Sequence, residues 1–143
     1  MIRVKKSFWK NKKILITGHS GFKGSWLSLV MKYLGANVYG ISLKPIYKKN
    51  LFDKINNKIF VKSYFFDLRN VDKTKKVINT IKPEIIFHFA AQPIVSEGYK
   101  DPLNTYSTNI LSTINIFESL KAKNFCKVLL VSTTDKVYEV HDQ

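Results

Sequence analysis

A short apolar run that leads directly into three evenly spaced glycines constrains the fold of this chain more than any other feature. Residues 14–16 are Ile-Leu-Ile, an uninterrupted apolar run typical of a central parallel strand that is buried on both faces. Gly18, Gly21 and Gly24 come next in a G-x-x-G-x-x-G pattern, and residues 25–31 then carry apolar side chains at helical spacing. The order of strand, glycine turn and helix is typical of the first unit of a dinucleotide-binding fold.

Each of the three glycines has its own task in such a turn. Gly18 allows the tight turn, Gly21 lets the backbone approach a pyrophosphate, and Gly24 lets the helix pack closely against the strand. The start of the helix then offers N–H groups and the positive end of its dipole to the phosphates. The alternative is an ordinary structural turn between strand and helix. Because the strand, the spacing and the helix occur together, we favour the phosphate-binding interpretation.

The composition supports one globular domain. The 143 residues, 45% of them hydrophobic, are enough for a sizeable core, so we expect residues 1–143 to form a single domain. No apolar run approaches the roughly 18 residues that a membrane span needs, and no secretory signal pattern is present, so the cytoplasm is the expected location. Cys126 is the single cysteine, which excludes a disulfide framework or a cysteine metal cluster. We expect it to be a packing residue and expect no metal site.

The formal net charge of +14 raises the question of nucleic-acid binding. The pattern argues against it, because Arg3 and Arg69 are the only arginines and the lysines are scattered along the chain instead of forming one stripe. Solvated surface lysines are the alternative interpretation, and we favour it.

Five apolar segments that alternate with helical patterns predict an α/β fold. The predicted strands are residues 13–17, 37–43, 59–66, 84–89 and 127–132. Helices are predicted over 23–33 and 71–82, whereas 45–58 is predicted to be an irregular loop with a short helical turn. With right-handed crossovers, these strands form a Rossmann-type doubly wound parallel sheet in the order 3-2-1-4-5. The fifth strand then lies at an edge of the sheet.

A further helix is predicted to begin at Asp101-Pro102. Polar and apolar side chains recur along it at intervals of three and four residues. These residues are Tyr106, Asn109, Ile110, Thr113, Ile114 and Phe117. We expect most of this face to belong to the core.

The segments after the second and third strands are the expected contacts for an adenosine. Ser42 and Lys44 stand near the end of the second strand, where an acidic residue would bind the ribose hydroxyls of NAD and a basic one could hold a 2′-phosphate. No acidic residue occurs there, so the residues alone leave NADP open. Asp67, just past the third strand, can accept a hydrogen bond from the adenine amino group. The alternative is that Asp67 or Asn70 caps the next helix.

The fourth and fifth strands deliver two further groups to the same edge of the sheet. The small residues Ala90 and Ala91 would let a dinucleotide lie against the backbone, although tight packing alone also explains them. Thr134, Asp135 and Lys136 place a hydroxyl, a carboxylate and an amine after the fifth strand, where they can transfer protons. A Thr/Asp turn with a solvated lysine is the alternative.

Four stretches of the chain together resemble the CDP-glucose 4,6-dehydratase family. They are residues 17–27 (TGHSGFKGSWL), 40–43 (GISL), 88–92 (HFAAQ) and 133–138 (TTDKVY). This family is a branch of the extended short-chain dehydrogenase/reductases, and the resemblance covers nearly the whole chain. The glycine motif and the alanine pair are shared across that superfamily, whereas the HSGFKGSWL form and the Thr-Asp-Lys triplet are typical of this branch.

The resemblance implies an NAD-dependent lyase that oxidises C4 of the glucosyl unit, eliminates water across C5 and C6, and returns the hydride to C6, giving CDP-4-keto-6-deoxyglucose for surface polysaccharides such as lipopolysaccharide. It implies that Thr134 bonds the 4-oxygen of the sugar and that Asp135 protonates the departing 6-hydroxyl. Lys136 matches the position where related enzymes carry a glutamate that acts on the C5 proton. The implied cofactor-binding residues are Gly18, His19, Gly21, Phe22, Lys23, Gly24, Ser42, Asp67, Leu68, Ala90, Ala91, Gln92 and Asn109.

One departure from the family pattern limits the expected activity. Family members carry a Tyr-x-x-x-Lys pair on the next helix, followed by a substrate-binding lobe, and the sequence ends at Gln143 before either. Tyr138 cannot take this role, because the fourth residue after it is Asp142. We therefore expect the NAD-binding N-terminal portion of a dehydratase, inactive alone. The family resemblance implies a homodimer for the full-length relative, and this chain alone can self-associate through its fifth strand. The other interpretations are a fragment of another nucleotide-sugar epimerase or dehydratase and a non-enzymatic basic binding module.

Overall fold

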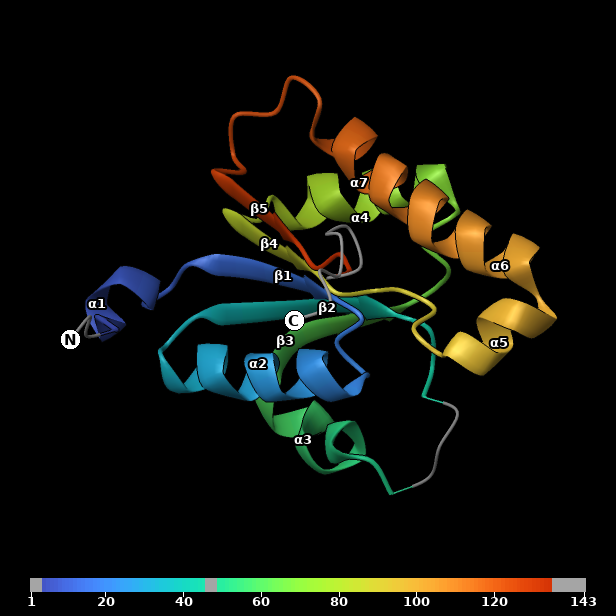
Figure 1. The fold of residues 1–143 in the computed structure, drawn as a ribbon. Coiled ribbons are helices and arrows are strands. Elements are labelled where there is room, and N and C mark those ends of the chain that lie inside the picture. Colours follow the sequence, from blue (N-terminus) through green and yellow to red (C-terminus); the bar gives the residue numbers. More distant parts are fainter. Residues whose placement is uncertain (1–3, 46–48, 135–143) are drawn as a thin grey trace, which may run out of the picture.

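A computed structural model describes residues 4–45 and 49–134. Its centre is a parallel sheet of five strands, connected by helices (Figure 1). The strands are β1 (Lys13–Thr17), β2 (Asn37–Ser42), β3 (Phe60–Phe65), β4 (Ile85–His88) and β5 (Val128–Val131). The helices are α1 (Lys6–Trp9), α2 (Phe22–Tyr33), α3 (Leu51–Ile59), α4 (Val71–Ile81), α5 (Val95–Lys100), α6 (Pro102–Tyr106) and α7 (Ser112–Leu120), with a π-helical segment, η1 (Ser107–Leu111), between the last two.

The strand order is β3-β2-β1-β4-β5, and every neighbouring pair is parallel. The predicted Rossmann-type order is therefore confirmed. Leu15 of β1 lies between Tyr39 of β2 and Ile86 of β4, which places the glycine-bearing strand in the middle of the sheet. The order reverses direction at β1, and in open α/β sheets ligands bind outside the carboxyl ends of the strands at such a reversal.

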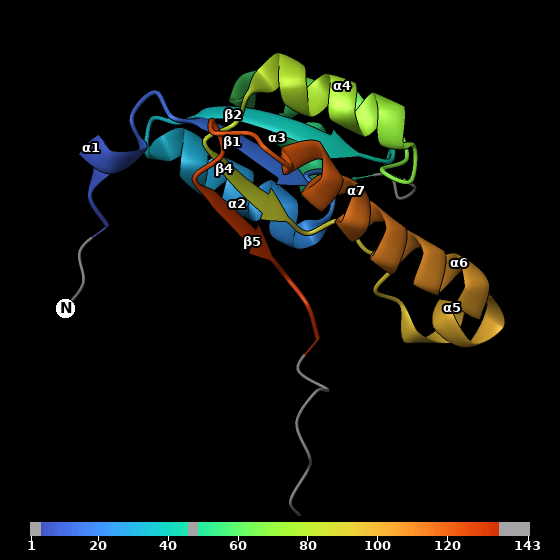
Figure 2. The same cartoon turned by 90° about the horizontal axis from the view of Figure 1, so that it is seen from above.

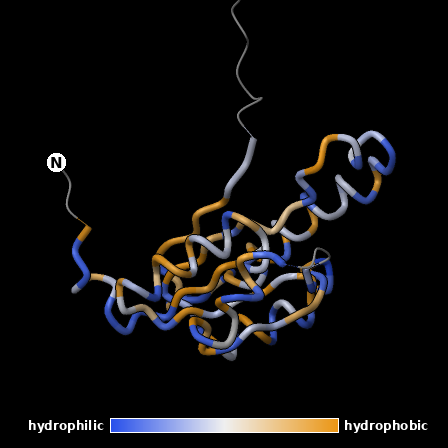
Figure 3. Tube along the Cα trace, turned by 90° about the horizontal axis from the view of Figure 1, so that it is seen from below, coloured by the Kyte–Doolittle hydropathy of each residue, from blue (hydrophilic) through white to orange (hydrophobic). Residues whose placement is uncertain are grey.

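Helices α2 and α3 cover one face of the sheet and α4 and α7 cover the other, as Figures 1 and 2 show. On the face beside α2, a core of Ile14, Ile16 and Val38 packs with Met31 and Leu34. On the opposite face, beside α4 and α7, the core contains Leu15, Ile41, Leu68, Ile78, Ile81, Ile86 and Ile116. Alternate residues of β1 thus enter opposite cores, which explains why this strand carries an uninterrupted apolar run. Hydrophobic residues accordingly lie along the central strands in Figure 3.

Two predictions about individual elements are wrong. Residues 51–59 form a nine-residue helix, α3, whereas residues 45–58 were predicted to be an irregular loop with only a short helical turn and residue 59 to begin a strand. The helix begins where Asn50 Oδ1 accepts a hydrogen bond from the amide of Asp53. The helical face predicted to be core is largely exposed, because Tyr106, Ile110, Ile114 and Phe117 keep 45–66% of their surface accessible. The buried side chains of α7 are Ser112, Ile116 and Ser119. Apolar residues at intervals of three and four indicate a helix, but here the residues at this spacing lie on its exposed side.

Three further local predictions agree with the structure. Asp101 caps α6 through a bond from the amide of Asn104, and Asn70 caps α4 through a bond from the amide of Lys73. Cys126 packs beside the core that contains Leu15, and its partial burial raises the pKa of its thiol. Among the described residues, no helix is both long and apolar enough to cross a membrane.

Candidate dinucleotide-binding site

Gly18 and Gly24 have the structural tasks predicted for them, whereas the contact of Gly21 with a pyrophosphate stays a prediction. Gly18 has a φ of 70°, and a Cβ on it would lie 2.9 Å from the backbone of Phe89 and Ala90, so a side chain is excluded twice. A Cβ on Gly24 would collide with the carbonyl oxygen of Gly18 and lie 2.7 Å from Cα of His19. Gly21 differs, because a Cβ there would meet only the Gly18 oxygen, at 3.3 Å. Gly21 therefore keeps an open approach to the turn, which is the space that a pyrophosphate needs.

The start of α2 completes an anion-binding arrangement. Gly21 is its N-cap and offers no side chain to the first N–H groups, and no acidic residue occurs in the first turn. Those N–H groups lack partners within the helix by geometry, and the positive end of the helix dipole adds to their attraction for phosphate. The predicted residues Phe22 and Lys23 are exposed beside this turn. The turn therefore fits a dinucleotide phosphate on the geometry of its own backbone.

His19 lies deeper than the rest of the motif. Its side chain is fully buried, with ring centroids 4.9 Å from Phe60, 5.1 Å from Phe52 and 5.5 Å from Phe65. Burial lowers its pKa to about 4, and the backbone of Ile41 opposes this lowering in part, although neither ring nitrogen has a contact with hydrogen-bond geometry among the described residues. His19 is neutral at pH 7 and anchors the turn to the aromatic residues around it. Its predicted contact with the cofactor stays a prediction.

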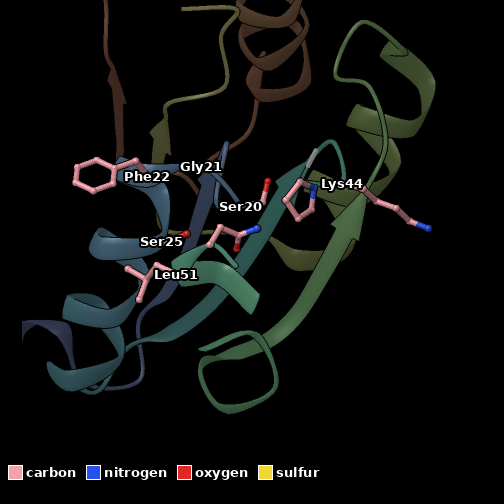
Figure 4. Close-up of a pocket in the computed structure, with 8 residues that line it drawn as sticks. Ser20, Gly21, Phe22, Ser25, Lys44 and Leu51 are labelled. Atoms are coloured by element: carbon pink, nitrogen blue, oxygen red, sulfur yellow. The ribbon is translucent and has the colours of Figure 1, made fainter. Parts of the chain in front are cut away.

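A pocket of about 430 Å³ adjoins the turn on its β2 side (Figure 4). The start of α2 and the segments around Lys44 and Leu51 enclose it. Ser20 lies at its edge and donates a hydrogen bond to the carbonyl of Leu43, 3.0 Å away. Ser42, at the end of β2, is 6% exposed, and its hydroxyl has no partner among the described residues. Its predicted contact with a ribose stays a prediction. Three residues that line the pocket were not predicted to lie at the site: Ser20, Asn50 and Leu51. Asn50 and Leu51 stand at the start of helix α3, and this helix was not predicted.

The segment after β3 holds Asp67, the predicted adenine contact, and Leu68, another of the implied cofactor-binding residues. Asp67 accepts hydrogen bonds from Nε and Nη2 of Arg69, at 2.9 and 2.6 Å, and this pairing lowers the pKa of its carboxyl. Because Asn70 caps α4, the capping interpretation of Asp67 is not needed. The side chain of Leu68 is buried in the core, so only its backbone could reach an adenine. Arg69 also donates to Asn104 and Ser107, which ties this segment to α6 and η1.

The loop after β4 is fixed by hydrogen bonds at both ends. Thr17 Oγ1 accepts from the amides of Phe89 and Ala90, each at 3.1 Å. Asn109 of η1 accepts from the amide of Gln92 at 2.8 Å and donates to its carbonyl at 3.3 Å. The structure thus brings the predicted residues Ala90, Gln92 and Asn109 together. Gly18 packs tightly against the backbone of Phe89 and Ala90 at the start of this loop.

A second pocket, of about 590 Å³, opens between this loop, α5 and the end of β5. Gln92, Tyr99, Tyr106 and the predicted catalytic residue Thr134 are among the residues that line it. Gln92 Nε2 donates to Thr105 Oγ1 at 2.8 Å, which fixes its side chain at the pocket wall. Asp135 and Lys136 lie outside the described residues. Among the described residues, no group of His, Cys, Asp or Glu side chains could hold a metal ion.

Comparison with known proteins decides the family. The family model of the GDP-mannose 4,6-dehydratases matches residues 15–139. The chain belongs to this family. It is 40% identical over 136 residues to the CDP-glucose 4,6-dehydratase of Salmonella typhimurium, a match that covers 95% of this chain and 38% of that protein. The predicted resemblance is thereby confirmed. The UDP-glucose 4-epimerase of Mycoplasma genitalium is 31% identical over 108 residues, covering 76% of this chain and 32% of its own length.

Solved structures share the fold at lower identity. The UDP-glucose 4-epimerase of Stenotrophomonas maltophila, with bound NAD and formylated UDP-arabinopyranose, has a TM-score of 0.79 and 21% identity, and the match covers 93% of this chain and 40% of that one. The UDP-glucose 4-epimerase of Bifidobacterium longum, in complex with NAD⁺ and UDP, has a TM-score of 0.73 and 24% identity, covering 87% and 38%. This chain therefore spans about two fifths of these relatives.

Proposed function

We propose that this chain is the NAD-binding portion of a nucleotide-sugar dehydratase that converts CDP-glucose to CDP-4-keto-6-deoxyglucose. The observation that carries the proposal is the glycine turn, whose Gly21 leaves an approach open while Gly18 and Gly24 do not. The identity to a CDP-glucose 4,6-dehydratase supports the substrate. A single NAD-binding domain over residues 1–143, a cytoplasmic location, a role in surface polysaccharide synthesis and a homodimeric full-length enzyme belong to the same proposal.

The residues divide along the proposed cofactor. The glycine turn and the start of α2 hold the pyrophosphate, while Ser42, Asp67 and the backbone of Leu68 face the adenosine half. Because β4 lies on the side of β1 opposite to β2, the other half of the cofactor extends over Ala90, Ala91 and Gln92. NAD is favoured over NADP by the relationship to NAD-dependent enzymes, although no acidic residue comes directly after β2.

Three residues beyond β5 are proposed to act on the sugar. The bound cofactor supplies a hydride acceptor for C4 and a donor for C6. Thr134 then bonds the 4-oxygen, Asp135 protonates the departing 6-hydroxyl, and Lys136 stands at the C5 proton, whose acidity rises once C4 is a ketone. The sugar would occupy the pocket that Thr134 and Gln92 line. Residues 1–143 hold no Tyr-x-x-x-Lys pair to remove the 4-hydroxyl proton, so we expect this chain alone to bind cofactor without turnover.

A second candidate function, nucleotide-sugar epimerisation, is favoured by the relationship to UDP-glucose 4-epimerases. The products separate the two reactions, because an epimerase retains the 6-hydroxyl whereas a dehydratase removes it. Chromatography of CDP-glucose and UDP-glucose incubated with a longer protein that contains this chain distinguishes them.

Cofactor titration tests the proposed binding function. We expect NAD to bind the 143-residue chain, and the Gly21→Val variant to lose at least about tenfold in affinity, because a branched side chain fills the approach to the turn. Thr80→Val, on the exposed side of α4, is the control, because Thr80 lines neither pocket. Equal affinities for wild type and Gly21→Val would remove the glycine turn from the site. Efficient conversion of CDP-glucose by this chain alone would contradict the expectation of inactivity.

A further inference from the structure

A continuous line of hydrogen bonds links β1, β4 and α7 next to the loop that follows β4. Thr17 Oγ1 of β1 lies 2.6 Å from Nδ1 of His88, the last residue of β4. Nε2 of the same ring lies 3.0 Å from Thr113 Oγ1 of α7, and Thr113 Oγ1 donates to the carbonyl of Asn109 at 2.7 Å. One imidazole thus joins the glycine-bearing strand β1 to helix α7.

The hydrogen-bond partners of Thr17, His88 and Thr113 determine which atom carries each proton in this line of hydrogen bonds. Thr113 has one hydroxyl proton and gives it to Asn109, so its oxygen must accept from His88, which makes Nε2 the protonated nitrogen. Thr17 Oγ1 already accepts from two amides, so its hydroxyl proton goes to the unprotonated Nδ1 of His88. The network is therefore complete with His88 neutral and in the Nε2–H form.

The surroundings hold the ring in that form. Thr17 is fully buried and His88 is 2% exposed. Burial lowers the pKa of His88 to about 4, so a second ring proton is absent at pH 7. A doubly protonated ring would have two donors, and the hydroxyl of Thr17 would lose its acceptor. A flipped ring would point its N–H away from Thr113.

Both ends of the line act on the same loop. Thr17 fixes the beginning of the loop through the amides of Phe89 and Ala90. Asn109 fixes its end through the amide and carbonyl of Gln92. His88 contacts Thr17 directly and reaches Asn109 through Thr113, so it stands between the two attachments.

We propose that His88 is a positioning residue for the nicotinamide half of the dinucleotide. By joining the two attachments of the loop, His88 makes the loop one rigid unit and holds the backbone of residues 90–92 in the position that contacts the cofactor. This inference rests on the proposed dinucleotide-binding function. Residues 90–92 lie on the β4 side of the glycine turn, opposite to the adenosine contacts on β2 and β3. Breaking the line should therefore weaken the cofactor contacts on one side of the pyrophosphate only.

Paired titrations with NAD and ADP-ribose, which lacks the nicotinamide, test this asymmetry. Thr113→Val removes the acceptor for His88 and the bond to Asn109, and we expect it to lose about three- to tenfold in NAD affinity while ADP-ribose affinity stays within about twofold. Thr113→Ser keeps the hydroxyl and should restore the wild-type ratio of the two affinities. Thr80→Val is the matched control, because Thr80 Oγ1 makes the same kind of bond, 2.8 Å to the carbonyl of Lys76, on the exposed side of α4.

Equal losses for NAD and ADP-ribose in Thr113→Val, or no loss of either, would overturn the inference while the proposed function stands. If the wild-type chain binds neither NAD nor ADP-ribose, the proposed cofactor binding is overturned, and the nicotinamide role of His88 is overturned with it.

Amide hydrogen exchange on the free chain tests the coupling without any ligand. Thr113→Val should accelerate exchange at Gln92 and also at Ala90, whose own bond to Thr17 the variant does not touch, and His88→Asn should do the same. Unchanged exchange at Ala90 in both variants would overturn the coupling. Nitrogen chemical shifts of the imidazole provide a second check, because a protonated Nδ1 at pH 7 contradicts the assigned form.

Discussion

Acid should unfold this chain well above the pH at which its carboxylates titrate, because two buried histidines must stay neutral in the folded state. His19 and His88 are both almost fully inaccessible, and burial lowers the pKa of each from 6.5 to about 4. In the unfolded chain both return to the ordinary value near 6.5 and take up protons that the folded chain excludes. Their contribution to stability is therefore complete above about pH 6.5 and is lost as the pH falls toward 4.

The size of this effect comes from the two pKa shifts. A difference of about 2.5 pKa units corresponds to about 3 kcal/mol or slightly more for each histidine, so the pair accounts for about 6–7 kcal/mol. Typical domains have only about 5–15 kcal/mol of stability in total. Between pH 6 and 4.5 the unfolded chain should thus bind almost two protons more than the folded chain. This difference is the slope in protons, and it lowers the free energy of unfolding by about 2.7 kcal/mol for each pH unit of acidification. Asp67 and Glu84 have pKa values lowered by their hydrogen bonds to Arg69 and Lys12, so their stabilisation is lost only as the pH falls below the ordinary range of carboxyl groups.

Urea unfolding followed by circular dichroism at a series of pH values measures the slope. His19→Leu removes one titrating group at similar volume and should reduce the slope to about one proton, and His88→Gln should do the same for the other. The positive charge of the chain is common to all variants, so it cancels in the comparison. A slope below half a proton in the wild-type chain, or ring pKa values near 6.5 by NMR, would refute the reasoning.

Two further predictions concern the packing. Gly24→Ala should destabilise the fold by about 2 kcal/mol or more in urea unfolding, because the added methyl meets only backbone atoms of Gly18 and His19. Gly98→Ala, where the nearest atom lies 3.7 Å away, should instead be neutral or stabilising by up to about 1 kcal/mol. A destabilisation of equal size in both variants would contradict this account. The chain should also self-associate through β5, the apolar edge strand, whose Val128 and Leu130 are 49% and 44% exposed. In light scattering, Leu130→Lys should reduce association more than Val61→Lys on the opposite edge strand β3, and a stable wild-type monomer at high concentration would rule the idea out.

The fold was predictable from the sequence because its main signals are local. The Ile-Leu-Ile run before Gly18 is typical of a strand buried on both faces, and the glycine spacing indicates the turn and the helix after that strand. Helix α3 was missed because its segment, with Asn56, Asn57 and several lysines, has the composition of a polar loop, and its burial against α2 comes from tertiary packing. The exposed face of α7 was misjudged for a related reason. Spacing reveals the period of a helix but does not reveal which side meets the sheet.

The candidate site was predictable only in part, because half of it depends on contacts between distant segments. The glycine turn is contiguous in the chain and is readable as a motif. The network through His88 joins residues that are 71 and 25 positions apart, and a histidine at the end of an apolar strand gives no hint of which hydroxyls it will meet. The one available signal was the polar residue itself, since a buried imidazole requires partners. His19 shows the limit of that signal, because it is buried among phenylalanine rings.

The position of His19 makes two distant sites in the sequence interdependent. Its ring occupies the space directly over Gly40 of β2, where an added Cβ would overlap the ring atoms Cγ and Cδ2. The missing side chain of one strand is thus replaced by a side chain from the neighbouring turn. Residues 19 and 40 can therefore vary only in concert during divergence. A lineage that acquires alanine at position 40 must first shrink residue 19, and a lineage that keeps the histidine must keep the glycine.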